Sequence, residues 1–197
     1  MIIDISSFQG AIDWRKVLSN NDIERVILRS TTKNGNLDVR FMENYNGLLK
    51  NSFKGVLDVY KFAYSKTYDS ALIESKKALE TLKARGVLRG INIFWLDIEN
   101  VDGARFSRAQ AESVIGAYRV MCEYYGVKFG IYANYDYVKN VLPQWAAIYP
   151  LWLARYNSIT GDVKPFNIEM WQYTSNGKIN GINGAVDLSR YVKGGKV

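Results

Sequence analysis

Two carboxylates stand two residues apart in the middle of this 197-residue chain. Asp97 and Glu99 lie in the segment FWLDIEN, residues 94–100, which reads as a buried strand. Side chains at this spacing on a strand point to one face, with Cα atoms about 6.5–7 Å apart. Two like charges so close, beside Phe94 and Trp95, should raise the pKa of one of them. A protonated carboxyl next to an ionised one is the combination that hydrolysis of a glycosidic bond requires.

A purely structural role is the alternative for these acids. A buried carboxylate is costly unless it is paired, so Asp97 could pair with Arg29 or another arginine at a strand end, or cap a helix. For a single aspartate this would be the better interpretation. Two carboxylates on one face favour a functional site.

Acids and aromatic residues also close other apolar segments. In a βα barrel, such strand ends converge on the face that holds the active site. Each aromatic residue alone could be core packing, but together with the acids they predict a carbohydrate cleft, because aromatic faces suit sugar rings and carboxylates suit hydroxyls. The residues are Asp4, Tyr60, Phe62, Tyr64, Tyr132, Asn134, Trp152, Tyr156, Trp171, Tyr173 and Asp187.

The elements that would position these residues alternate along the chain. Strands are predicted at residues 2–6, 25–30, 55–64, 91–99, 128–134, 151–156, 168–173 and 185–190, and helices at 14–20, 41–51, 70–85, 107–125 and 135–142. The helix at 107–125 is the clearest. Ser107 and Gln110 form a capping box, Gly126 is a C-terminal stop, and Cys122 lies in the apolar stripe, which assigns it to the core.

The last third of the chain differs from the rest. The segments 158–167 and 175–184 are rich in glycine, asparagine and turn residues, and neither is long enough to hold a helical crossover between parallel strands. At least one of the last strands should therefore run antiparallel. The prediction is an irregular, TIM-like α/β barrel of about five βα units followed by three strands, in one domain over residues 1–191, with residues 192–197 as a possible linker stub.

Composition narrows the chemistry. The chain has no histidine, so acid–base work falls to carboxylates, tyrosine, lysine or cysteine, and no metal or cofactor is expected. One cysteine excludes an internal disulfide. The net charge of +7 comes from scattered lysines and arginines without a nucleic-acid motif, which suits adsorption to anionic polymers rather than nucleic-acid recognition. No run is apolar and long enough to enter a membrane. No signal peptide is visible, so we expect the protein to be made in the cytosol unless a leader has been removed. We also expect a monomer.

The chain resembles glycoside hydrolase family 25, the lysozymes (N-acetylmuramidases) of phage endolysins and bacterial autolysins. The similarity rests on seven segments in the family's order, and it covers nearly the whole chain. They are DISSFQGAIDW (4–14), VILRST (26–31), YKFAY (60–64), FWLDIE (94–99), GIYAN (130–134), LWLARY (151–156) and WQYTSNGKINGINGAVDLSRY (171–191). The resemblance implies an irregular barrel of five βα units and three further strands.

The resemblance also implies roles. Glu99 falls on the family's catalytic proton donor and Asp97 on the aspartate that assists it, while Asp4 and Asp187 fall on two further aspartates of the cleft. The implied reaction is cleavage of the β-1,4 bond between N-acetylmuramic acid and N-acetylglucosamine in peptidoglycan, on the bacterial cell wall. One departure is Lys61, which stands where members often carry histidine, and it could alter the contacts of a sugar subsite.

Two points of mechanism and two rival functions stay open at this stage. Asp97 could orient the substrate's N-acetyl group as an internal nucleophile, with retention, or Asp97 or Asp187 could activate water, with inversion. A chitinase or glucosaminidase is one rival, but Trp95 interrupts the DxDxE pattern of chitinases of family 18. A non-catalytic carbohydrate-binding barrel is the other, and such proteins usually lose the acid that Glu99 supplies.

Overall fold

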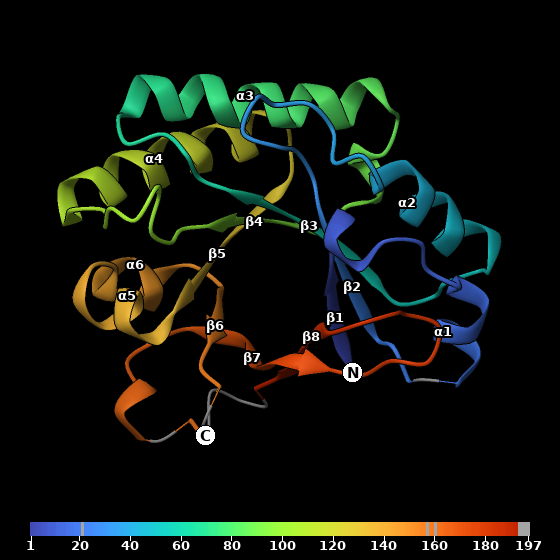
Figure 1. Ribbon diagram of the computed structural model, residues 1–197. Helices are drawn as coiled ribbons and strands as arrows, with labels where there is room; N and C mark the ends of the chain where they lie inside the picture. The colour runs from blue at the N-terminus through green and yellow to red at the C-terminus, as the bar shows by residue number, and fades with distance from the viewer. Residues whose placement is uncertain (21, 157, 160, 193–197) are drawn as a thin grey trace.

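Eight strands close into a single barrel in the order of the sequence (Figure 1). The computed structural model describes residues 1–20, 22–156, 158–159 and 161–192, so most of the predicted linker stub lies outside the described residues. The strands are β1 (Ile2–Ile5), β2 (Arg25–Arg29), β3 (Val56–Phe62), β4 (Ile93–Asp97), β5 (Lys128–Asn134), β6 (Leu151–Ala154), β7 (Ile168–Gly177) and β8 (Val186–Tyr191). The first seven run parallel to their neighbours, and β8 is antiparallel to both β7 and β1. The predicted fold class is confirmed.

Helices surround the part of the barrel formed by β1 to β6 (Figure 1). They are α1 (Trp14–Asn20), α2 (Phe41–Lys50), α3 (Tyr68–Ala84), α4 (Arg108–Tyr124), α5 (Tyr135–Asn140) and α6 (Pro143–Ile148), with short 3₁₀ turns η1 (Ser7–Gln9), η2 (Leu88–Gly90) and η3 (Gly161–Val163). The long helices α3 and α4 lie side by side on one side of the barrel (Figure 1). In the described part of the chain, no helix has the length and apolar character needed to cross a bilayer.

Local sequence explains where the helices begin and end. The predicted capping box is present at α4, where the Ser107 side chain accepts from the Gln110 amide and the Gln110 side chain accepts from the Ser107 amide. The helix predicted over residues 135–142 is present as α5, which ends at Asn140, and the separate short helix α6 that follows was not predicted. Pro143 disfavours helical geometry at the residue before it, and Leu142 accordingly leaves the helix with φ −115° and ψ 17°.

The last strands form a hairpin instead of a βα unit. The loop of residues 178–185 between β7 and β8 folds back on the N-terminal segment, where Asp13 donates its amide to the Gly181 carbonyl at 2.9 Å and Ile12 forms a β-bridge with Ile182. Gly181 has φ +99°, and a Cβ there would lie 2.7 Å from the Asp13 carbonyl oxygen, so only glycine fits this contact.

Side chains inside the barrel form a small core of their own. It contains Ile2, Ile27, Ile93, Trp95, Trp152 and Met170, with Tyr132 and Tyr60 above them. The larger core lies between the barrel wall and the helices and includes Cys122, which is fully buried as predicted. Burial raises the pKa of the Cys122 thiol, which favours the unreactive protonated form.

Candidate active site

Four carboxylates meet at the end of the barrel where the parallel strands finish. Asp4 on β1 and Asp187 on β8 are directly opposite each other in the antiparallel pair that closes the barrel. Asp97 is the last residue of β4 and lies beside Phe62 of β3 and Tyr132 of β5. The charges of Asp187 and Asp97 both act on Asp4, so the acids of three strands face one another. The predicted convergence of strand ends is therefore present.

Glu99 reaches the same side as Asp97 although β4 ends before it. The backbone stays extended for one more residue, because the Ile98 amide donates to the Tyr132 carbonyl at 3.0 Å. Ile98 is buried in the outer core and Glu99 is half-buried on the opposite side, so the alternation of a strand continues. The next residue, Asn100, accepts a hydrogen bond from the Tyr137 hydroxyl at 2.8 Å, which fixes the loop that follows.

The four carboxylates have no cationic partner among the residues that the structure describes. In the described part of the chain, no Lys or Arg forms an ion pair with Asp4, Asp97, Glu99 or Asp187. Arg29, the partner considered for Asp97, binds Asp38 at 2.5 Å instead and donates to Ser7. The Oδ1 atom of Asp97 is buried and accepts no hydrogen bond from the described residues. The structural interpretation of Asp97, a carboxylate held by arginine, is therefore wrong.

Burial raises the pKa of all four acids, and the charge of a neighbouring acid raises it further for Asp4, Asp97 and Glu99. The pKa of Asp97 is raised well above its usual range by burial and then by the Glu99 charge, against a smaller lowering by Lys61. The pKa of Glu99 is raised by burial and then by Asp187. Asp4 has its pKa raised strongly by burial and by Asp187. Asp187 has a pKa that burial raises and a hydrogen bond with Asp4 lowers. Groups that stay protonated near neutral pH can donate protons to a leaving group.

Aromatic residues of β3 line one side of this acidic group. Tyr60 and Phe62 are half-buried and share the inward face of β3, and Tyr64 follows the strand with its ring 4.8 Å from that of Phe62. The charges of Asp4 and Asp97 raise the pKa of Tyr60 beyond the effect of burial, which places its hydroxyl near both. These three predicted residues are brought together at the acids.

On the side of the acids opposite β3, Gln172 of β7 links two of the carboxylates to two tyrosine hydroxyls. This residue was not predicted from the sequence. Its Nε2 donates to Asp4 at 3.0 Å and to Asp187 at 3.4 Å. Its Oε1 accepts from the hydroxyls of Tyr132 at 2.9 Å and Tyr156 at 3.1 Å. The alternation of side chains along β7 could have identified it, because Gln172 is two residues from Met170 of the barrel core and so shares the inward face of the strand.

Four of the predicted cleft residues have other roles. Trp152 is 1% exposed inside the barrel and donates its indole N–H to Ser189 at 3.0 Å, so it cannot stack on a sugar. Trp171 points outward from β7, is buried in the outer core, and donates to the Arg155 carbonyl. Asn134 caps α5 by accepting from the Tyr137 amide at 3.0 Å. Tyr173, next along β7, also packs against the outer core. Aromatic composition alone did not reveal which side of each strand these residues occupy.

Lys61 does not contact a sugar subsite, contrary to the expectation from its position. It is fully buried on the outer side of β3, where its ammonium group binds Glu74 of α3 at 2.7 Å. Glu74 also accepts hydrogen bonds from the backbone amides of Tyr64 and Ser65. This ion pair therefore holds the loop that carries Tyr64, and Lys61 reaches the acids only through its charge.

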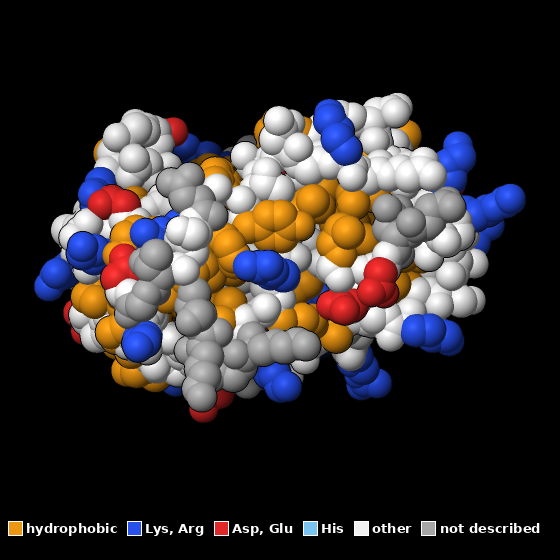
Figure 2. Space-filling model, turned by 90° about the horizontal axis from the view of Figure 1, so that it is seen from below, with side chains coloured by type: hydrophobic (Ala, Val, Ile, Leu, Met, Phe, Trp, Pro, Cys, Tyr) orange, Lys and Arg blue, Asp and Glu red, His pale blue; other side chains and the backbone are white. Residues whose placement is uncertain are grey.

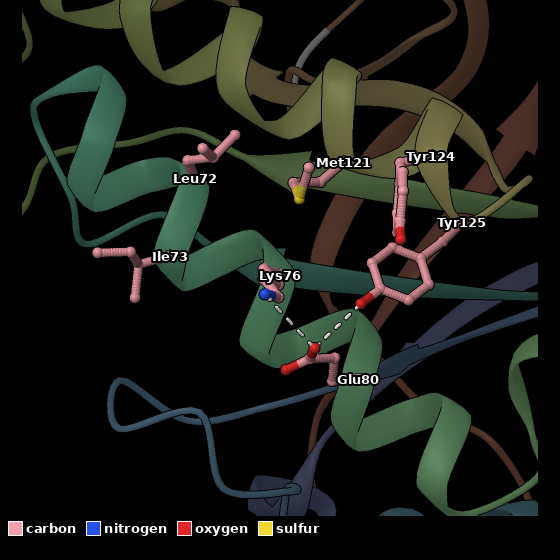
Figure 3. A pocket seen from close by; sticks show the side chains of 7 residues that line it. All are labelled: Leu72, Ile73, Lys76, Glu80, Met121, Tyr124 and Tyr125. Carbon is pink, nitrogen blue, oxygen red and sulfur yellow. Dashed lines mark hydrogen bonds and ion pairs between the residues drawn. The ribbon is translucent and has the colours of Figure 1, made fainter.

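A separate groove of about 430 Å³ lies on the outside of the barrel between α3 and α4 (Figure 3). Leu72, Ile73 and Met121 line it, and Glu80 crosses one end, bound by the Tyr125 hydroxyl at 3.2 Å and by Lys76 at 3.8 Å. None of the four clustered carboxylates borders this groove. It is therefore not part of the candidate site.

A comparison with known families agrees with this geometry. The model of the family described as glycosyl hydrolases family 25 matches residues 3–182, which include Asp4, Asp97 and Glu99. The chain belongs to glycosyl hydrolases family 25. The family recognition is thereby confirmed, and the chain is a glycoside hydrolase.

Relatives and solved structures of similar fold include proteins of bacteria and phage. The uncharacterized protein YegX of Escherichia coli K12 is 25% identical over 95% of this chain and 67% of its own length. The modular autolysin LytC of Streptococcus pneumoniae, solved in complex with a synthetic peptidoglycan ligand, is 24% identical with a TM-score of 0.81. That match covers 95% of this chain and 45% of LytC. The catalytic domain of endolysin ply40, from bacteriophage P40 of Listeria monocytogenes, is 23% identical with a TM-score of 0.76, over 98% of this chain and 92% of that domain.

Proposed function

We propose that the protein is a lysozyme that cleaves the β-1,4 bond between N-acetylmuramic acid and N-acetylglucosamine in peptidoglycan, and so acts on the bacterial cell wall. The observation that carries this proposal is the group of four carboxylates at the carboxyl end of the barrel of a family 25 chain, Asp4, Asp97, Glu99 and Asp187, none of which pairs with a cation in the described part of the chain. Glycosidic hydrolysis needs a carboxyl that keeps its proton and a carboxylate that stabilises positive charge at the reacting carbon.

Glu99 is the proposed proton donor. It is half-buried and so can reach a bound glycan, and its raised pKa keeps the proton available for the leaving oxygen. Asp97 is the proposed assisting group. It is almost fully buried at the end of β4, where its carboxyl could orient the substrate's N-acetyl group and, once ionised, oppose the positive charge that develops on the sugar. Asp187, opposite Asp4, is the other candidate to activate water.

The wall of the cleft supports a glycan substrate. Tyr60, Phe62 and Tyr64 provide aromatic surface on the β3 side, and Tyr132 and Tyr156 provide hydroxyls on the other. Tyr156 is 54% exposed, so its ring is open to a bound sugar. Asp4 and Asp187 shape the floor between the two sides.

The charge on the surface supports adsorption to anionic wall polymers. Figure 2 shows that Lys and Arg side chains are scattered over the face seen there, most of them around its margin, with hydrophobic side chains across the middle. A dispersed positive charge attracts polyanions without forming a specific recognition site.

Digestion of purified peptidoglycan tests the reaction. The products are reduced with borohydride and their new ends are identified by mass spectrometry. We expect muramitol ends. Glucosaminitol ends would indicate a glucosaminidase instead, peptides without new reducing ends would indicate an amidase or peptidase, and binding without any cleavage would indicate a carbohydrate-binding barrel.

Activity in the presence of a chelator is a second test of the assignment of catalysis to carboxylates. If carboxylates alone perform the chemistry, activity on peptidoglycan should be unchanged in EDTA. A loss that zinc or magnesium restores would contradict the proposed roles.

A further inference from the structure

Gln172 is a neutral side chain that bonds to two of the four carboxylates. It lies on β7 with 1% of its side chain exposed, and its partners come from β1, β5, β8 and the residues after β6. Its amide makes four hydrogen bonds, two through Nε2 to Asp4 and Asp187 and two through Oε1 to Tyr132 and Tyr156. A primary amide has two N–H donors and two acceptor lone pairs, so its bonding capacity is fully used.

The orientation of this amide follows from its partners. An ionised carboxylate accepts hydrogen bonds and cannot donate, so a single ionised member of the pair is enough to turn the N–H₂ side of Gln172 toward Asp4 and Asp187. The two tyrosine hydroxyls then hold Oε1 on the opposite side. A reversed amide would place its oxygen against the ionised carboxylate, which is unfavourable. The donors are therefore fixed toward the acids before any substrate binds.

We propose that Gln172 is a positioning residue that sets the distribution of protons in the cleft. Its two N–H groups hold Asp4 and Asp187 as a pair that shares one proton, so that a negative charge remains on Asp187, faces Glu99 and keeps Glu99 protonated. This inference rests on the proposed function, in which Glu99 is the proton donor.

The electrostatics of the group agree with this arrangement. Asp4 has the more strongly raised pKa of the pair, and its hydrogen bond lowers the pKa of Asp187, which assigns the shared proton to Asp4. Asp187 is the largest charge effect on the pKa of Glu99 after burial. The other titratable or charged groups that face these acids are Asp97, Tyr60, Tyr132, Tyr137, Tyr156 and Arg29, whose guanidinium is already bound to Asp38.

A packing role alone does not account for these contacts. Buried amides are normally hydrogen-bonded, and a residue that only filled space could take its partners from the backbone or from neutral groups. All four partners of Gln172 are instead ionisable groups of the cleft. The chain offers a contrast in Asn44 on α2, a buried amide whose Oδ1 accepts from the Trp14 indole at 3.2 Å, far from the acids.

The test is the variant Gln172→Met, which keeps the length of the side chain and removes both donors. Without them Asp187 takes up a proton at higher pH, less charge faces Glu99, and the pKa of Glu99 falls. We expect the Glu99 carboxyl to titrate about one pH unit lower by ¹³C NMR, the size of a lost hydrogen bond to a charged group. The alkaline limb of activity should move with it, with about tenfold lower kcat/KM above that limb.

Two further variants keep the proposal testable. Asn44→Leu removes a buried amide far from the cleft, so it should lower stability without moving either titration. If Gln172→Met does not fold, Tyr132→Phe keeps the ring packing and removes one of the two hydroxyls that orient the amide. It should shift the titration of Glu99 in the same direction by a smaller amount.

The outcomes separate this inference from the proposed function. A folded Gln172→Met protein in which Glu99 titrates as in the wild type overturns the inference, and so does a shift of equal size in Asn44→Leu. The carboxyl titration needs no substrate, so it reports on Gln172 even if the wild-type protein leaves peptidoglycan intact. That last result would contradict the proposed function and leave the proton distribution supported.

Discussion

The two ends of the barrel interior both hold buried charge, and they treat it in opposite ways. At the amino end of the strands, Arg25 lies between two acids, with its guanidinium 2.6 Å from Glu169 and 3.5 Å from Asp58. Asp58 also accepts hydrogen bonds from the indole of Trp95 at 2.7 Å and the amide of Ile93 at 3.1 Å. Every acid at this end has a donor and a cation.

At the carboxyl end of the strands, the described residues do not give each acid a donor and a cation. Among the described residues, Asp4 and Asp187 share one glutamine amide, and Asp97 has an oxygen with no donor. Unpaired buried charge lowers stability, so a fold retains it only where the charge has another use. The paired end stabilises the barrel, and the unpaired end is the place to look for chemistry.

The largest expected effect comes from the unpaired end. Glu99→Gln preserves shape but cannot donate a proton, so turnover on soluble glycan fragments should fall by roughly 10²–10⁴-fold or more. The free energy of unfolding should hold or rise, because one of several crowded like charges is removed. Asp97→Asn should also reduce turnover strongly, whereas Asp4→Asn should have a smaller effect. Near-normal activity in Glu99→Gln, with activity abolished in Asp187→Asn, would move the proton donor to the last strand.

The paired end should show the reverse behaviour. Arg25→Met leaves Asp58 and Glu169 without their cation, and breaking a buried ion pair in this way should cost about 3–5 kcal/mol of unfolding free energy. Turnover per folded molecule should be unchanged. Lys76→Met, which removes an exposed partner of Glu80, is the matched control and should cost less than about 1 kcal/mol. A loss of turnover in Arg25→Met at full folding would remove the distinction between the two ends.

The dependence of stability on pH should come largely from the unpaired end. The folded protein raises the pKa of Asp97 above its unfolded value, so the folded state binds the extra proton. Its contribution to stability is complete below the unfolded pKa and is lost as the pH rises through the folded pKa. Stability should therefore fall from mildly acidic toward neutral pH, by about 1.4 kcal/mol for each unit by which a pKa is raised.

The variant Asp97→Asn isolates this effect in urea titrations at several pH values. Asp58 also has a pKa raised by burial, and it remains in the variant, so the difference between the two curves reports Asp97. The variant should show a flatter dependence on pH. Parallel curves for both proteins would mean that Asp97 gains no proton on folding.

The smallest expected effect concerns charges outside the barrel. Exposed lysines and arginines are screened within about 8 Å at physiological salt, whereas buried acids are screened much less. Lysis of whole cells should weaken severalfold as ionic strength rises, and cleavage of short soluble glycans should respond much less. An equal response in both assays would exclude a role for surface charge in adsorption.

Periodicity in the sequence was sufficient to predict most of the fold. Apolar runs located all eight strands, and the turn-rich segments in the last third predicted an antiparallel strand. The Ser107 capping box placed the start of α4 correctly. The exception is α6, which was missed because a helix of 6 residues is too short to show a clear apolar period.

Site residues could be predicted where alternation along a single strand places them on one face, as for Asp97 and Glu99. They could not be predicted where the outcome depends on which face of a strand points inward. Trp152 and Trp171 have the composition of sugar-binding residues, but one is enclosed in the barrel and the other lies outside its wall. Gln172 and the Lys61–Glu74 pair required knowledge of partners far away in the sequence.

The contact between the first and last strands also determines when the protein can become active during its own synthesis. Asp4 leaves the ribosome long before Asp187, and the two meet only when β8 pairs with β1 (Figure 1). Pairing over such a sequence distance is a late event in folding. A chain whose β8 has not yet been made therefore carries Glu99 and Asp97 in an unclosed barrel. Bacteriolytic activity of the kind proposed here would arise only after β8 has been made and has paired with β1.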